Sequence, residues 1–288
     1  NKIVAIIREE MNVLGGQEVH LSALQDREVW EKTGRWADKA VDSWFKTELK
    51  NGAEAGLGFT HEEPLTAIMR YHIASYKDLP QYPYQFQIKF RNETRAKSGI
   101  IRGREFLMKD LYSFSADEAA HKLFYEKVKQ AYKNIFTRIG FGNYTYLTYA
   151  SGGSFSKYSH EFQTLCDAGE DTIHLCEKCL VAVNEEIISE QTACPVCGSE
   201  NFVKKTAVEV GNIFTLGTKF SDALGLKYRN EAGQEVSVFM GSYGIGPGRA
   251  MGVAAELFAD GRGLVWPVSI APFDVHLVSL SAKSDETR

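Results

Sequence analysis

The chain of 288 residues is long enough for one large domain or two small ones with an ample core. Its net charge of −4 excludes a global basic field that would attract nucleic acid, so any RNA contact must use a local patch. No apolar run approaches the roughly 20 residues of a membrane span, and residues 1–16 read as an amphipathic helix rather than a signal peptide. We therefore expect a cytoplasmic protein without membrane contact. The chain starts inside this helix without an initiating Met, which is typical of a fragment.

Apolar residues at helical spacing predict a helix over residues 3–14, which Gly15-Gly16 ends. Residues 17–24 then read as a strand. Residues 37–58 have a mixed composition and are rich in Gly toward their end, which predicts a loop region.

A second helix is predicted from the apolar residues between Leu65 and Tyr76. Its start fits two patterns equally well. Thr60 with Glu63 fits a capping box, and Glu63 followed by Pro64 at the first helical position fits as well.

Strict alternation marks residues 84–91 as a half-buried strand, and the polar side of this strand continues to Glu93. A Gly- and Lys-containing loop follows, and a second strand-like run covers residues 104–114. Together they predict an antiparallel hairpin with a face that carries arginines, a carboxylate and an aromatic ring. Such a face suits a nucleotide, because arginine binds phosphate oxygens bidentately and a ring stacks on a purine. The alternative is an edge hairpin with a solvated charged face.

Residues 117–139 predict an amphipathic helix that ends at Gly140, with an apolar side for core packing formed by Leu123, Phe124, Val128, Tyr132, Ile135 and Phe136. A Gly/Ser loop, residues 151–163, then leads to His160. A single histidine at such a place is more often a structural hydrogen-bonding group than a catalyst.

Two C-x-x-C pairs, Cys176 with Cys179 and Cys194 with Cys197, are separated by fourteen residues. Four thiolates at this spacing predict a zinc ribbon. Four cysteine ligands leave no position for water, so the Zn²⁺ would be structural. Cys166 is expected to be a buried or partly buried free thiol, and His174 is a less favoured competing ligand. Cysteine use of this kind also fits a reducing compartment.

Residues 208–219 and 236–243 read as strands, and the second enters a Gly-rich turn that leads to a helix over residues 250–258. The glycines do not follow G-x-G-x-x-G, because Arg249 stands at the last position, which disfavours a dinucleotide fold. The turn instead places Arg249 in the first turn of a helix, where the N-terminus favours anions.

The patterns F-R-x-E, from Phe90 to Glu93, and R-x-x-x-F, from Arg102 to Phe106, resemble motif 2 of the class II aminoacyl-tRNA synthetases. The string GREFLMKDLYSF looks like the prolyl-tRNA synthetases of the bacterial type. The first helix and strand resemble motif 1, the class II dimer interface, although Ser22 stands where this family has a proline. The strand, Gly-rich turn and helix around Arg249 match motif 3. The resemblance implies an α+β fold, an antiparallel sheet flanked by helices with an inserted zinc ribbon, and a homodimer.

The resemblance also implies substrates and site residues. L-proline would be activated with ATP and Mg²⁺ and transferred to tRNA(Pro). Proline would be held by Thr60, Glu62, Arg91 and His160. ATP would be bound by Arg91, Glu93, Arg102, Phe106, Glu209 and Arg249, of which Arg91 and Arg249 would be catalytic and Glu209 would serve the Mg²⁺.

The expected organisation is a catalytic core in two parts, residues 1–165 and 207–270, with the zinc ribbon over residues 166–206. Residues 271–288 would start an anticodon-binding domain. About forty residues between the S-H-E-F segment, residues 159–162, and Val208 are too few for an editing domain. Three alternatives stay open: another class II synthetase such as the threonyl type, a non-catalytic synthetase-like protein that binds an amino acid or a partner, and an RNA-binding module.

Overall fold

The computed structural model describes residues 1–94, 96, 98–153 and 155–278. Its helices are α1 (Lys2–Val13), α2 (Arg27–Glu31), α3 (Glu62–Met69), α4 (Glu118–Ile139), α5 (Lys219–Leu224) and α6 (Pro247–Phe258), with short 3₁₀ helices η1 (Tyr76–Asp78), η2 (Gly99–Ile101), η3 (Gly142–Tyr144) and η4 (Glu185–Ile187). Its strands are β1 (Gln17–Glu18), β2 (Leu24–Asp26), β3 (Phe45–Glu48), β4 (Glu54–Leu57), β5 (Pro83–Phe90), β6 (Glu105–Ser115), β7 (Thr145–Ser151), β8 (Tyr158–Leu165), β9 (Asp171–Cys176), β10 (Ala182–Asn184), β11 (Phe202–Gly217), β12 (Lys227–Arg229), β13 (Glu235–Ser237), β14 (Phe239–Ile245), β15 (Ala259–Asp260) and β16 (Gly263–Leu264).

Within these residues, nine strands form one sheet in the order β1-β5-β6-β14-β11-β8-β7-β10-β9. The pairings are antiparallel except for the two short pairs β1–β5 and β10–β7. Strand β11 is unusually long and pairs in succession with β9, β8 and β14. Because β11 pairs with both β8 and β9, the strands β11, β8, β7, β10 and β9 form a closed ring of paired strands. Strand β11 itself runs without interruption from the cysteine-containing segment into the central sheet.

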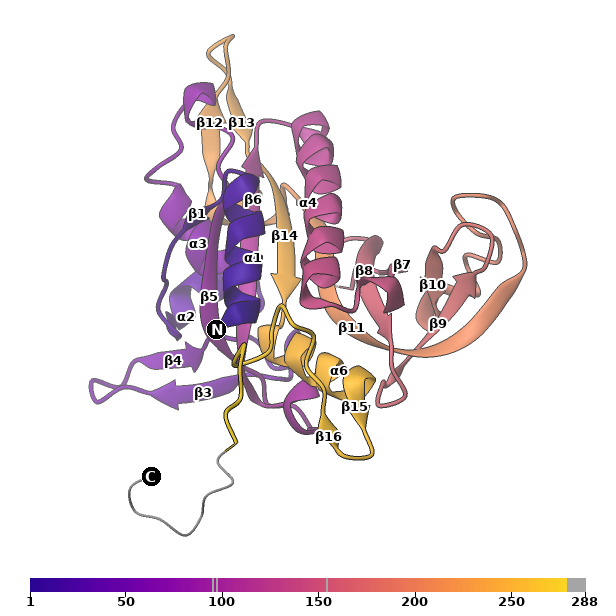
Figure 1. The fold of residues 1–288 in the computed structure, drawn as a ribbon. Coiled ribbons are helices and arrows are strands. Elements are labelled where there is room, and N and C mark those ends of the chain that lie inside the picture. The colour runs from indigo at the N-terminus through magenta and orange to yellow at the C-terminus, as the bar shows by residue number, and fades with distance from the viewer. Residues whose placement is uncertain (95, 97, 154, 279–288) are drawn as a thin grey trace.

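Helices α1 and α4 cover one face of this sheet (Figure 1). The expected helix over residues 117–139 is confirmed: the side chain of Asp117 accepts from the backbone N–H of Ala120, and Gly140, with φ of 116°, ends it. The predicted apolar side is buried except for Leu123, which is 71% exposed. The core on this side contains α1, α4 and α6 packed on the sheet.

A second apolar cluster packs α3 and α5 against β6 and β14. Beside it, β2, β4 and β3 form a separate small sheet, so the loop expected over residues 37–58 is wrong in part. The β3–β4 hairpin has few buried side chains, which is why its composition looked like that of a loop. Its base is closed by a cluster of rings, Trp30, Trp36, Trp44 and Phe59.

Three other local predictions need correction. Residues 17–24 form only the two-residue strand β1 and the start of β2. Helix α3 has His61 at its N-cap with no side-chain capping bond, and the Thr60 hydroxyl donates to the Glu62 carboxylate, 2.5 Å away, so neither capping pattern holds. The Gly/Ser loop ends before Tyr158, because His160 lies inside β8.

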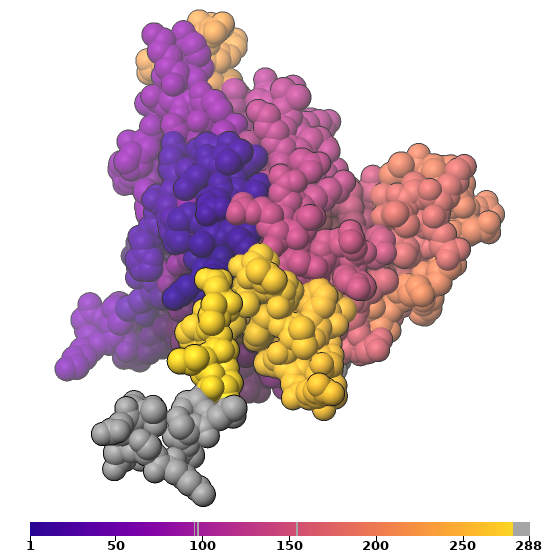
Figure 2. Space-filling view, in the orientation of Figure 1, coloured from indigo at the N-terminus to yellow at the C-terminus, as the bar shows by residue number. Residues whose placement is uncertain are grey.

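The segment from β9 to the start of β11, with η4 and the four paired cysteines, forms a protruding lobe at one end of the sheet (Figures 1 and 2). We call residues 171–206 the cysteine lobe. It packs a small core of its own, which includes Ile173, Leu175 and Ala182. No helix among the described residues is long and apolar enough to cross a membrane.

Candidate active site

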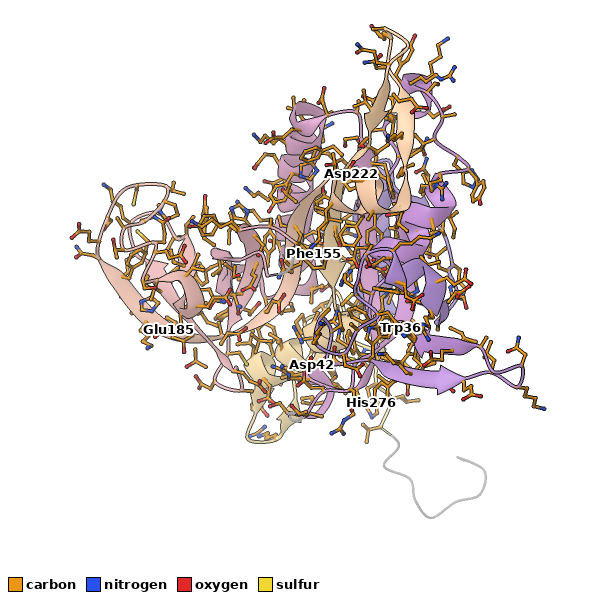
Figure 3. The ribbon with its side chains drawn as sticks, turned by 180° about the vertical axis from the view of Figure 1, so that it is seen from behind. Trp36, Asp42, Phe155, Glu185, Asp222 and His276 are labelled. Carbon is orange, nitrogen blue, oxygen red and sulfur yellow. The ribbon has the colours of Figure 1, made fainter. Side chains whose placement is uncertain are left out.

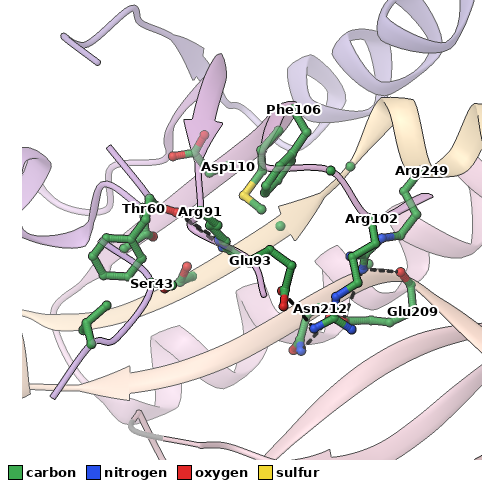
Figure 4. Close-up of a pocket in the computed structure, with 18 of the residues that line it drawn as sticks. Ser43, Thr60, Arg91, Glu93, Arg102, Phe106, Asp110, Glu209, Asn212 and Arg249 are labelled. Atoms are coloured by element: carbon green, nitrogen blue, oxygen red, sulfur yellow. Dashed lines mark hydrogen bonds and ion pairs between the residues drawn. The ribbon is translucent and has the colours of Figure 1, made fainter. Parts of the chain in front are cut away.

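A cavity of about 730 Å³ opens on the sheet face that α1 and α4 leave uncovered. From behind, Phe155, which lines it, lies near the centre of the view with Asp42, also a lining residue, below it, and Glu185 of the cysteine lobe lies to one side (Figure 3). Every predicted proline- or ATP-binding residue except His160 lines the cavity: Thr60, Glu62, Arg91, Glu93, Arg102, Phe106, Glu209 and Arg249. In Figure 4, Thr60 and Arg91 lie toward one end, and Arg249 and Glu209 lie toward the other.

The hairpin β5–β6 supplies the floor of this cavity. Gln85 pairs in register with Asp110, and Lys89 pairs with Phe106, so these side chains share one face of the sheet. The polar residues of β5 lie beneath the cavity instead of facing solvent: Gln85 is 1% exposed and Lys89 is completely buried. The alternative of a solvated charged face is therefore wrong for β5.

A buried network centred on Asp110 satisfies these polar groups. Its Oδ2 accepts from the Lys89 ammonium at 2.8 Å, the Tyr112 hydroxyl at 2.9 Å and the Gln85 amide at 3.0 Å. The Lys89 ammonium also lies 2.6 Å from Nδ1 of His61, whose pKa is lowered to about 4 by burial and by this cation. His61 is thus a neutral acceptor in the network, and Asp110 Oδ1 has no hydrogen-bond partner in the described part of the chain.

At one end of the cavity, Glu62 is oriented by three neighbours. Its Oε2 accepts from Thr60 and lies 3.6 Å from Arg35, and its Oε1 accepts from the Ser242 hydroxyl at 3.1 Å. Arg35 lies closer to Glu63, at 2.9 Å, than to Glu62, at 3.6 Å, so Glu62 is not its main partner and is available to a cationic ligand. A carboxylate with an adjacent hydroxyl suits an ammonium group.

Two arginines make the rest of the cavity attractive to anions. Arg91 donates to the Phe59 carbonyl at 3.3 and 3.4 Å, and its guanidinium carbon lies 5.3 Å from the centre of the Phe106 ring. Burial lowers the pKa of Arg91, and repulsion from Arg249 lowers it further. Two cations that repel one another across a cavity favour a polyanion between them.

Arg249 lies in the first turn of α6, as predicted, although this helix begins at Pro247 and not at residue 250. Its Nε donates to the Ile101 carbonyl at 2.9 Å, and its guanidinium also donates to the Glu209 carbonyl at 2.8 Å. Arg102 instead bridges two carboxylates, Glu93 and Glu170, each at 2.9 Å. Arg249 is therefore held mainly by backbone carbonyls, with a longer ion pair to the Glu209 carboxylate at 3.5 Å, whereas Arg102 is held by ion pairs to two carboxylates.

A β-bulge places Glu209 and Asn212 together. The pairing of β11 with β8 shifts between Glu209 and Gly211, so Val210 is an extra residue. In a regular strand, residues three apart point to opposite faces, and a bulge reverses this relation. Both side chains consequently line the cavity, with Asn212 Nδ2 2.9 Å from Glu209 Oε1.

Sequence reasoning missed several residues of this site: Arg35, Asp110, Ser242, Asn212 and, beneath it, Glu161. Asp110 carried one usable signal, since it stands on the same face of β6 as Phe106. Asn212 carried none, because the bulge depends on pairing between distant strands.

The structure does not bring His160 to the cavity. Its Nδ1 lies 2.8 Å from the hydroxyl of Tyr125 on α4, and its ring contacts Tyr149 edge-on. His160 thus faces the helix-covered side of the sheet, and the next residue, Glu161, faces the cavity side. Burial lowers the pKa of His160 to about 3.

We expect the stability advantage of the native chain over a His160→Gln variant to shrink as pH falls from 7 to 5. The unfolded histidine, with a pKa near 6.5, takes up a proton that the folded ring does not accept. The stability that the neutral ring contributes is complete above this pKa and is lost progressively below it. Denaturant unfolding of both proteins at pH 7, 6 and 5 measures the effect, and parallel pH profiles would contradict it.

The four paired cysteines come together as predicted. Their sulfur atoms all lie within 4.8 Å of one another, and the two closest pairs, Cys176–Cys197 and Cys179–Cys194, are 3.5 and 3.3 Å apart. A tetrahedral ion at about 2.3 Å from each sulfur needs this spacing, so the donor set fits a structural metal. Cys166 is buried and outside the cluster, and His174 is hydrogen-bonded to Glu185.

Comparison with known proteins gives a consistent result. Residues 45–258 match the family model of the tRNA synthetase class II core domain (G, H, P, S and T). The chain is 39% identical to a probable mitochondrial proline–tRNA ligase of Schizosaccharomyces pombe, over 98% of this chain and 66% of that protein. It is 35% identical to the proline–tRNA ligase of Bartonella bacilliformis, over all of this chain and 70% of that protein.

The alignment with the proline–tRNA ligase of Geobacillus kaustophilus, at 30% identity, extends over 437 residues and covers all of this chain and 77% of that protein. That protein therefore has many additional residues within the matched region. Among solved structures, the Giardia lamblia prolyl-tRNA synthetase in complex with prolyl-adenylate superposes with a TM-score of 0.76 at 20% identity. The match covers 94% of this chain and 49% of that one, so this chain spans about half of the solved relative.

Proposed function

Because this chain belongs to the class II aminoacyl-tRNA synthetases, and among them to the prolyl-tRNA synthetases, we propose that it is the catalytic core that activates L-proline with ATP and transfers it to tRNA(Pro). The observation that carries the proposal is one cavity with a carboxylate at one end and two arginines and an aromatic ring beside it. Such a cavity matches an amino acid and a nucleotide bound together.

The first step joins a proline carboxylate oxygen to the α-phosphorus of ATP, and the bond from this phosphorus to pyrophosphate breaks. The tRNA 3′ hydroxyl then attacks the prolyl carbonyl carbon, and AMP leaves. A carboxylate is already ionised at neutral pH, so the first step needs no general base. The protein contributes positioning and neutralisation of charge.

In this proposal, Thr60 and Glu62 bind the secondary ammonium group of proline. Arg91 bridges the proline carboxylate and the α-phosphate. Phe106 stacks on adenine with Glu93 beside it, and Arg249 binds the outer phosphates. Arg102 joins Arg249 after it exchanges its ion pairs with Glu93 and Glu170 for phosphate oxygens.

Glu209 and Asn212 fit a Mg²⁺ ion that accompanies ATP. They offer a carboxylate and an amide oxygen, the hard oxygen ligands that Mg²⁺ prefers. Asn212 Oδ1 is buried and has no partner among the described residues, as a ligand atom would before binding. The ion would neutralise phosphate charge.

We further propose that the four cysteines hold one structural Zn²⁺. A Cys194→Ser variant should lose the metal and unfold at a lower temperature, because a neutral hydroxyl replaces one of four thiolates. Metal analysis should find about one zinc per native chain. A Cys166→Ser variant is the matched control and should keep the metal. Equal metal content in the two variants would contradict the assignment.

The proposed aminoacylation also requires two macromolecular partners. These are tRNA(Pro) and a second copy of the chain that forms a homodimer through α1 and β1. We also propose that the segment between β8 and β11 is too short to hold an editing domain; the alignment with the Geobacillus kaustophilus protein, which extends over 437 residues, is consistent with an additional domain in that relative. The cytoplasm is the proposed compartment, with the mitochondrion as the alternative that the names of some relatives suggest.

Amino-acid-dependent ATP–pyrophosphate exchange tests the function directly, with proline beside threonine, alanine, serine and glycine. We expect exchange with proline alone. Exchange with threonine would identify another class II specificity. Binding of proline without exchange, in a chain extended to the full length of its relatives, would favour a non-catalytic amino-acid-binding protein.

A further inference from the structure

The cysteine lobe lies outside the cavity, yet two of its polar residues make hydrogen bonds that reach Glu161 of β8. Asn184, the last residue of β10, donates from Nδ2 to Glu161 Oε2 at 3.0 Å. Asp171, the first residue of β9, accepts from the Gln163 amide at 2.9 Å, and the same amide donates to Glu161 Oε2 at 2.8 Å. Glu161 is 8% exposed, so these are interior contacts.

The other carboxylate oxygen of Glu161 points toward the cavity wall. Its Oε1 lies 3.4 Å from Asn212 Nδ2, which also donates to Glu209 at 2.9 Å. Glu209 in turn binds Arg249 through its backbone carbonyl at 2.8 Å. The contacts thus form a continuous chain from the lobe to the groups at the phosphate end of the cavity.

Glu161 has no direct route to a ligand, since it is not among the residues that line the cavity. Both of its carboxylate oxygens accept from amide N–H groups, Oε2 from Gln163 and Asn184 and Oε1 from Asn212, so it orients several amides at once. Its place in the network is that of a connector.

We propose that Glu161 is a positioning residue through which the cysteine lobe, by way of Asn184, holds Asn212 and Glu209 in the orientation suited to the Mg²⁺ that accompanies ATP. The lobe thereby supports the nucleotide half of the site and leaves the proline half to α3 and β5. This inference rests on the proposed function for the identity of the nucleotide.

Asn184→Ser is the sharpest test. Asn184 also caps η4 by accepting from the Glu186 N–H, and serine keeps this capping ability while it is too short to reach Glu161. We expect affinity for a non-hydrolysable ATP analogue with Mg²⁺ to fall about 3- to 10-fold, the usual size of coupling through packed networks. In pyrophosphate exchange, the KM for ATP should rise by the same factor while the KM for proline stays constant.

Lys204→Ala is the matched control, because it removes an exposed ion pair with Glu185 within the same lobe. It should leave both KM values unchanged. A second pair of variants tests the connector itself: Glu161→Gln keeps one acceptor oxygen for the amides of Gln163 and Asn184 and should keep most of the affinity for the analogue, whereas Glu161→Leu keeps none and should lose about 10-fold or more.

An Asn184→Ser protein that binds the analogue as tightly as the native protein would overturn the inference, as would equal changes in the two KM values. Loss of affinity in Glu161→Gln as large as in Glu161→Leu would also overturn it. Failure of the proposed function is distinguishable, because it would abolish proline-dependent exchange in the native protein while analogue binding could still be measured.

Discussion

Arg91→Ala should lower the rate of proline-dependent ATP–pyrophosphate exchange by at least about 100-fold, the usual cost of losing one preorganised group that stabilises developing charge. In the proposed site, the guanidinium bridges an oxygen of the proline carboxylate and an oxygen of the α-phosphate, the two groups that the new bond joins. Its stacking against Phe106 and its bonds to the Phe59 carbonyl fix this orientation. We therefore expect the effect mainly in kcat.

The same variant should fold normally, because the contacts seen for Arg91 are with a carbonyl group and a ring. Thermal unfolding and circular dichroism check this point. Arg91→Lys is a suitable companion: it keeps the charge but cannot bridge two acceptors with a planar fork, so it should remain strongly impaired. Near-normal adenylation by Arg91→Ala would defeat the assignment of this residue.

Asp110→Ala should reduce the free energy of unfolding by about 3–5 kcal/mol, because it leaves the Lys89 ammonium buried without its counter-charge. Lys89 is fully buried, and burial already lowers its pKa, an effect that Asp110 partly offsets. The substitution also removes the acceptor for the hydroxyl of Tyr112. Denaturant unfolding at neutral pH measures the loss.

The double variant Lys89→Met/Asp110→Ala is the control for this explanation. Removal of both charges should restore part of the stability that Asp110→Ala loses, since no uncompensated cation then remains in the interior. The explanation would be wrong if the two effects were additive. In that case the double variant would lose as much free energy of unfolding as the two single variants together, and the two residues would be energetically independent.

The elements that could be predicted from the sequence are those set by local periodicity. The alternation of β5 and the 3.6-residue spacing of α4 are properties of neighbouring residues, and both elements were predicted correctly. The clustering of Cys176, Cys179, Cys194 and Cys197 could be predicted from the affinity of thiolates for metal ions and from the spacing of the two C-x-x-C pairs. Eight residues predicted from the motifs line the cavity, because each lies at the end or on one face of such an element.

The failures share a different cause, which is dependence on distant partners. The burial of Gln85 and Lys89 was not predicted, because it depends on Asp110 and His61, which the fold places beside them. The β3–β4 hairpin has little apolar surface of its own and is stabilised at its base by tryptophans from other segments. His160 was assigned to the proline pocket by resemblance, but the alternation of β8 turns its ring toward Tyr125.

The bulge in β11 has a consequence for how this family can change. Val210 is the residue without a partner on β8, and its presence turns Glu209 and Asn212 to the same side. Substitution of Val210 by another apolar residue keeps the additional residue and therefore the bulge. Deletion of Val210 would return β11 to regular pairing with β8 and would turn the side chains of Glu209 and Asn212 to opposite faces. The number of residues in this part of β11 therefore decides which side Glu209 and Asn212 face, as much as the identity of each residue does. We expect insertions and deletions to be rarer here than substitutions.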